Sequence, residues 1–85
     1  MPDQDLDRVD AVVQRVLLDR EIRRAVAPDE DLRETGLTSL DMVSLVLSVE
    51  AEFDLKVPDG DITPANFRSI AAIRGLVAGL LAGVS

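Results

Sequence analysis

Residues 38–53 decide the fold, and they read TSLDMVSLVLSVEAEF. Either Thr38 or Ser39 can cap a helix here, because a hydroxyl accepts hydrogen bonds from the first backbone N–H groups. Asp41 adds a favourable negative charge in the first turn. Turn-forming residues follow at positions 56–60 and end the helix near Phe53. This segment therefore predicts a long helix that begins at Thr38 or Ser39.

Apolar side chains cover more than half of the circumference of this predicted helix. A surface helix needs an apolar stripe that is only about 100° wide or a little more. The excess has two explanations. Either the helix is buried centrally between the other helices, or Leu40, Val43 and Leu47 form an exposed patch for a partner, edged by Glu50 and Asp54.

Two further helices are expected on either side of this segment. Apolar residues at helical spacing predict a first helix over about residues 4–20, with Asp3 or Asp5 as its cap. The same spacing predicts a last helix over about residues 70–81, capped by Ser69.

The connections complete the predicted architecture. Residues 28–38 show no clear period and are expected to form a long ordered loop anchored by Leu32. Thr63 and Pro64 predict a short helical turn, because proline is tolerated in the first turn of a helix. The sequence thus predicts an all-α fold, an irregular four-helix bundle of three main helices and one short helix. It forms a single domain over residues 1–85.

The composition excludes several kinds of chemistry. The chain has 85 residues, and none is cysteine or histidine. Disulfides, thiolate zinc sites, cysteine nucleophiles and histidine general bases are therefore excluded. The turn at residues 59–61 resembles part of a calcium-binding loop, but positions 55 and 57 lack the oxygen ligands that such a loop needs. We predict a binding or carrier protein rather than an enzyme, without a catalytic residue or a metal site.

The charge argues against some partners and for others. A net charge of −7 disfavours nucleic acid and anionic membranes. Residues 29–61 hold 10 of the 16 acidic residues and only 2 of the 9 basic ones. A field of one sign attracts a basic partner, and it predicts binding that weakens as salt rises. The chain shows no targeting segment and no long apolar span, so we expect a cytoplasmic monomer.

Ser39 is the most informative polar residue. It lies at the predicted start of a helix, just after the loop that contains Gly36. That position places a hydroxyl beside backbone N–H groups, which suits a phosphate. Without a histidine the hydroxyl has no obvious base to activate it, so Ser39 is a better target for another enzyme than a nucleophile. The alternative is that Ser39 serves only as a helix cap.

Residues 34–43, ETGLTSLDMV, resemble the attachment motif of acyl and peptidyl carrier proteins, whose core is Asp-Ser-Leu. The segments 45–53 and 57–59 resemble the rest of that family's second helix and the turn after it. Residues 70–80 take the place of its last helix, so the resemblance covers about residues 6–82. It implies that a phosphopantetheinyl transferase attaches 4'-phosphopantetheine to Ser39, and that the terminal thiol of this arm holds a substrate as a thioester.

The resemblance also implies a set of partners. These are the transferase, an acyl- or aminoacyl-loading ligase or transferase, and a downstream condensing or tailoring enzyme. The residues that match the family's partner-recognition helix are Leu40, Asp41, Met42, Val43, Leu47 and Glu50.

Two positions depart from the family's usual pattern. Thr38 stands where Asp is most common, and Ser44 stands where carriers of the fatty-acid type usually have Glu. The pattern resembles freestanding carriers of secondary metabolism, which implies an acyl carrier of polyketide or related natural-product biosynthesis. An aminoacyl or peptidyl carrier of the nonribosomal type is the alternative. A helical adaptor that binds a basic protein, with Ser39 unmodified, is a third possibility.

Overall fold

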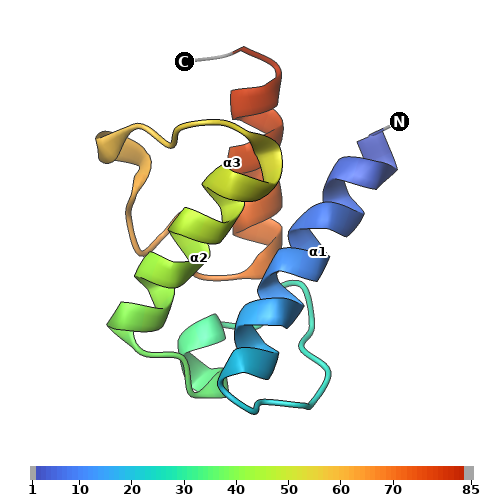
Figure 1. The fold of residues 1–85 in the computed structure, drawn as a ribbon, viewed down its shortest axis with the longest axis vertical. Coiled ribbons are helices and arrows are strands. Elements are labelled where there is room, and N and C mark those ends of the chain that lie inside the picture. Colours follow the sequence, from blue (N-terminus) through green and yellow to red (C-terminus); the bar gives the residue numbers. More distant parts are fainter. Residues whose placement is uncertain (1, 84–85) are drawn as a thin grey trace.

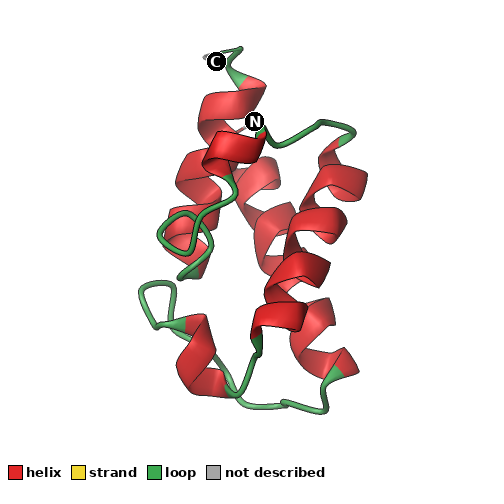
Figure 2. Cartoon of the chain, turned by 90° about the vertical axis from the view of Figure 1, so that its left-hand side faces the viewer, coloured by secondary structure: helices red, strands yellow, loops and turns green. Residues whose placement is uncertain are grey.

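Three α-helices make up the fold. The computed structural model describes the backbone of residues 2–83 and the side chains of residues 7–83. The helices are α1 (Pro2–Asp19), α2 (Ser39–Phe53) and α3 (Ile70–Leu81), and α1 runs in the opposite direction to the other two (Figure 1). Loops and turns join them, and no strand occurs in the described part of the chain (Figure 2). The all-α prediction is confirmed.

The predicted fourth helix is not found among residues 2–83. Short 3-10 turns occur instead at η1 (Leu32–Thr35) and η2 (Asp59–Asp61). The segment that begins at Thr63 is a hydrogen-bonded turn, in which Phe67 N–H donates to the Thr63 carbonyl at 3.3 Å. The Thr63 hydroxyl accepts from Asn66 N–H at 3.3 Å, as in a helix N-cap, but this single turn is not continued as a helix.

The first helix begins earlier than predicted. Pro2 opens α1, which places Asp3 and Asp5 inside the first turn rather than at the cap. Proline suits the first helical position because its missing N–H would have no partner there in any case. Leu6, which belongs to the predicted apolar stripe, has its side chain outside the described residues.

The core lies between the three helices. Helix α1 packs against both α2 and α3. The segment between α2 and α3 contributes Val57 and Phe67, which are 0% and 2% exposed. Leu32 is also fully buried, so it anchors the first loop as predicted. The other buried apolar residues, nearly all aliphatic, come from the three helices, apart from Leu37 in the loop just before α2.

The outer face of α2 decides between the two explanations for its excess apolar surface. Leu40, Val43 and Leu47 are 75%, 53% and 60% exposed. The buried apolar residues of α2, Leu45, Val46, Val49 and Phe53, all lie on the opposite side, so α2 faces the core with one side only. The proposal of a centrally buried second helix is therefore wrong, and the exposed patch is present.

Candidate functional site

Ser39 is the first residue of α2 and is exposed. The chain enters the helix through Gly36, whose backbone is left-handed with φ of 111°, a conformation that favours glycine. Thr38 has an extended backbone and forms the N-cap. The first turn of a helix directs backbone N–H groups that have no partner within the helix outward, toward the Ser39 end.

A capping box fixes this helix start. The Thr38 hydroxyl accepts a hydrogen bond from Asp41 N–H at 3.3 Å, and the Asp41 carboxylate accepts from Thr38 N–H at 2.8 Å. Arg20, just past the end of α1, places its Nε 3.3 Å from Oδ2 of Asp41. The hydrogen bond from Thr38 N–H, assisted by the Thr38 hydroxyl and Arg20, lowers the pKa of Asp41 although burial opposes this. Asp41 therefore stays ionised and holds Ser39 in helical geometry.

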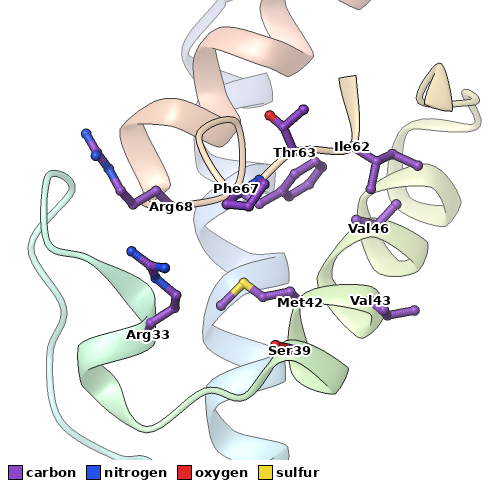
Figure 3. A pocket seen from close by; sticks show the side chains of 10 residues that line it. Arg33, Ser39, Met42, Val43, Val46, Ile62, Thr63, Phe67 and Arg68 are labelled. Carbon is purple, nitrogen blue, oxygen red and sulfur yellow. The ribbon is translucent and has the colours of Figure 1, made fainter. Parts of the chain in front are cut away.

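An apolar pocket opens beside Ser39. It has a volume of about 250 Å³ and lies between α2 and the segment 62–68 (Figure 3). Its apolar lining comes from Met42, Val43, Val46, Ile62, Pro64 and Phe67. Ser39 is one of the lining residues and lies at the edge of the pocket, at the start of α2 (Figure 3). An extended, mostly uncharged group attached at Ser39 could lie against this surface.

Two arginines border the same pocket. Arg33 from η1 and Arg68 from the segment before α3 lie on the opposite side from Val43 and Ile62 (Figure 3). Arg68 is held there because its carbonyl accepts from Leu32 N–H at 2.7 Å. Arg33 pairs with Asp31 at 3.0 Å, and this contact lowers the pKa of the Asp31 carboxyl. The pocket thus has an apolar side and a side with two arginines, of which Arg33 is paired with Asp31.

The six predicted recognition residues fall into two groups. Leu40, Val43 and Leu47 are exposed on one face of α2. The other three are engaged within the chain. Met42 lines the pocket, Asp41 is buried in the capping box, and Glu50 accepts from Val57 N–H at 2.8 Å. The structure therefore brings the three apolar residues together on the surface and gives the other three internal contacts.

Sequence reasoning missed the part of the site that comes from distant segments. Arg33, Ile62, Phe67 and Arg68 approach α2 only through the path of the two loops. A local signal did exist for the capping box, because a hydroxyl residue followed three positions later by a carboxylate fits that motif.

No group of three or more metal-ligating side chains converges within residues 7–83. None of the helices in residues 2–83 combines the length and the hydropathy that a bilayer crossing requires.

The fold and the site define a class of protein. A small helical domain that exposes a serine at a helix N-terminus, beside an apolar pocket, and that contains no histidine or cysteine has the features of a carrier module. The chain belongs to the family described as "Phosphopantetheine attachment site", which matches residues 7–78. Proteins of this family carry covalently attached 4'-phosphopantetheine on a serine and are not catalysts themselves.

Similar proteins include two from Bradyrhizobium diazoefficiens, Aminoacyl carrier protein 2 and Aminoacyl carrier protein 1. They are 46% and 41% identical to this chain over 71 residues, which cover 84% of this chain and 80% and 79% of the relatives. A similar solved chain occurs in the crystal structure of Bradyrhizobium japonicum glycine:carrier protein ligase complexed with glycylated carrier protein. It has a TM-score of 0.76 and 36% identity, covering 85% of this chain and 96% of that chain.

These relatives confirm the predicted carrier family. They give no support to the predicted place in polyketide or related natural-product biosynthesis, because the names of the relatives point to aminoacyl carriers.

Proposed function

We propose that this protein is an aminoacyl carrier protein, which holds an amino acid as a thioester on 4'-phosphopantetheine attached to Ser39. The observation that carries the proposal is the exposed position of Ser39 at the start of α2, beside the pocket. The aminoacyl carrier relatives favour an amino acid over the acyl cargo that the sequence first suggested.

The other serines within the matched residues are less suitable. Ser69 is buried, and its hydroxyl accepts a hydrogen bond from Ala72 N–H at 3.1 Å as the cap of α3. Ser44 and Ser48 lie on the side of α2 that faces the end of α1, in a groove shared with Asp19 and Arg20. Ser39 alone among these four combines an exposed hydroxyl with a helix N-terminus and with the apolar pocket.

The residues around Ser39 fit a phosphopantetheine arm. The helix N-terminus and the cation of Arg68 favour a phosphodiester, whereas the Arg33 guanidinium is already paired with Asp31. Met42 and Phe67 offer apolar contact to the rest of the arm. The arm supplies a terminal thiol, which is the nucleophile that carries the cargo. The chain has no cysteine, so no side-chain thiol competes for the cargo.

The chain's own residues hold and present Ser39 but do not activate it. With no histidine, no imidazole is available to remove the hydroxyl proton. Asp41 stays ionised, but it is buried in the capping box, where Thr38 and Arg20 occupy its carboxylate. A phosphopantetheinyl transferase must therefore supply the base, and an aminoacyl-loading ligase must activate the amino acid. An acceptor enzyme then takes the amino acid from the arm.

Intact mass tests the attachment. The purified chain is incubated with coenzyme A and a phosphopantetheinyl transferase of broad specificity. We expect one phosphopantetheine on the wild type and none on Ser39→Ala, while Ser44→Ala gains the same mass as the wild type. Phosphopantetheine on Ser39→Ala would contradict the assignment of Ser39. If neither the wild type nor Thr38→Asp gains phosphopantetheine, the result contradicts the carrier assignment and favours the unmodified adaptor.

Loading tests the cargo. The modified protein is then incubated with ATP, glycine and the Bradyrhizobium ligase that is found in complex with carriers of similar structure. We expect a second mass gain that hydroxylamine removes, because hydroxylamine cleaves thioesters. If the modified protein accepts an acyl group from an acyl-loading enzyme but no amino acid from this ligase, the aminoacyl proposal is wrong.

A further inference from the structure

We infer that Arg68 is a specificity-determining residue of the carrier: it places a positive charge beside the arm on Ser39 without offering an amine that would take the cargo. A thioester transfers its acyl group to free amines and thiols. A carrier must therefore lack such groups wherever its own arm reaches. The inference rests on the proposed function, because it needs a thioester attached through Ser39.

The side chains that attack a thioester readily are scarce in this chain. It contains no cysteine and no histidine, and of its 9 basic residues one is lysine and the others are arginine. Lysine attacks as the neutral amine, whereas the arginine guanidinium stays protonated in proteins and is not a nucleophile. The positive charge of the chain is therefore carried almost entirely by groups that a thioester does not acylate.

The one lysine, Lys56, lies at the far end of α2 from Ser39. Ser39 is the first residue of α2, and Lys56 follows the last one, Phe53, by three positions. Val57 N–H donates to the Glu50 carboxylate at 2.8 Å, which holds this segment against the last turn of the helix. The 15 residues of α2 span about 22 Å. Most of the length of the helix thus separates the lysine from the attachment site.

Arginines take the basic positions around Ser39. Arg33 and Arg68 line the pocket that Ser39 borders (Figure 3). Arg20 pairs with Asp41 in the first turn of the same helix at 3.3 Å. Arg68 is exposed as well, so an arm that lies against the pocket passes within its reach. A lysine would supply the same charge at position 68, so the difference that bears on a thioester is the reactivity of the group.

Arg68→Lys would convert the pocket into an acceptor of the cargo. The neutral lysine nitrogen would attack the carbonyl carbon of the thioester, a C–N bond would form and the C–S bond would break. The proton on nitrogen passes to solvent, and the sulfur leaves as the free thiol of the arm. Because both groups belong to one chain, their effective concentration is high. The product is an amide, which is more stable than the thioester and withholds the cargo from an acceptor enzyme.

A preloaded arm tests the inference without a ligase. Acetyl-coenzyme A replaces coenzyme A in the transferase reaction, so the arm arrives with an acetyl thioester. The protein is held at about pH 9, where part of a lysine with the ordinary pKa of about 10.4 is neutral. Hydroxylamine then removes thioesters but not amides. We expect Arg68→Lys to retain at least about tenfold more acetyl than the wild type, measured by intact mass and located at residue 68 by peptide fragmentation.

Two control variants separate position from charge. Arg15→Lys adds an amine at an exposed site beside Glu52, which is in the last turn of α2, away from Ser39. Arg68→Gln removes the charge and adds no amine. We expect both to stay within about twofold of the wild type in retained acetyl, because neither places an amine next to the arm. Dilution should leave the result for Arg68→Lys unchanged, since the transfer occurs within one chain, and circular dichroism confirms that all variants remain folded.

The possible outcomes separate the inference from the proposed function. If Arg68→Lys retains no more acetyl than Arg15→Lys, the residue at position 68 does not determine where the cargo goes and the inference is wrong. It is also wrong if the wild type transfers acetyl to Lys56 as fast as Arg68→Lys transfers it to position 68, or if Arg68→Gln retains as much acetyl as Arg68→Lys. Failure of the wild type to gain the acetylated arm instead contradicts the attachment at Ser39. Failure to load glycine contradicts only the aminoacyl cargo.

Discussion

At the residue scale, Thr38 has a clear structural role, although it departs from the pattern of the family. Its hydroxyl accepts from Asp41 N–H and donates to the Asp41 carboxylate at 3.0 Å. Threonine therefore serves α2 as a cap and keeps Ser39 in the first turn. What threonine lacks is the negative charge of aspartate, and Asp41 places a carboxylate close by in the same cap.

Replacement of Thr38 measures the strength of this cap. Thr38→Ala is expected to lower the free energy of unfolding by about 1 kcal/mol, because an orphan N–H and the Asp41 carboxylate both lose a partner. Thr38→Ser is the matched control and should retain stability to within about 0.5 kcal/mol, since serine caps as well as threonine. Urea unfolding followed by circular dichroism measures both. Equal stability of the alanine and serine variants would show that the cap contributes nothing.

At the element scale, α2 has an exposed face and a buried face, and valine occurs on both. Val43 is 53% exposed, whereas Val46 is 7% exposed and packs with the core. Val46→Ala is expected to cost about 1–2 kcal/mol, because it removes buried methyl groups and leaves a cavity. Val43→Ala should stay within about 0.5 kcal/mol of the wild type. Urea unfolding of the two variants checks this, and equal losses would mean that Val43 is buried in solution.

Periodicity predicted all three main helices and both hydroxyl caps, because helix formation depends on residues close in sequence. It placed the start of α2 at Thr38 or Ser39 and the cap of α3 at Ser69, as the structure shows. The helical turn expected at Thr63 is present as a single hydrogen-bonded turn, but a fourth helix is not confirmed, because the length of such a turn depends on a few hydrogen bonds. Whether the wide apolar surface of α2 is buried or exposed could not be predicted, because an apolar stripe does not identify the element that covers it.

The part of the candidate site that lies in one segment of sequence was predictable, and the part built from distant loops was not. Ser39 and the exposed face of α2 follow from one contiguous segment. The pocket does not, since Arg33, Phe67 and Arg68 reach α2 only when two separate loops fold. Backbone hydrogen bonds join these loops, from Leu32 N–H to the Arg68 carbonyl at 2.7 Å and from Ala71 N–H to the Pro28 carbonyl at 2.8 Å. Such pairings between distant residues leave no periodic signal in a single sequence.

At the scale of the whole molecule, the carboxylates govern how stability depends on pH. The pKa of Glu30 is lowered mainly by its contact with Arg24, and that of Asp31 by its contact with Arg33. The pKa of Asp41 is lowered mainly by its contact with Thr38. Because these groups release their protons more readily in the folded chain, the unfolded chain binds more protons in acid. The stabilisation is therefore complete above the unfolded pKa of about 4 and is lost as pH falls through the lower folded values.

Chemical unfolding at a series of pH values tests this. We expect the free energy of unfolding to fall steadily below about pH 4. Asp41→Asn should be less stable at neutral pH and should show a shallower decline in acid, because one of the groups that titrates has been removed. A free energy of unfolding that stays constant from neutral pH into acid would contradict the role of these carboxylates.

The opposed direction of α1 and α2 has a practical consequence. The molecule measures 34 Å along its longest axis. Pro2 at the start of α1 and the last turn of α3 lie toward one end of that axis, and the start of α2 lies toward the other (Figure 1). A bead, a biosensor chip or a fused neighbour joined at either terminus would therefore hold Ser39 facing outward, toward whatever approaches from solution. Immobilised in that way, the chain is already oriented for a partner to reach its serine.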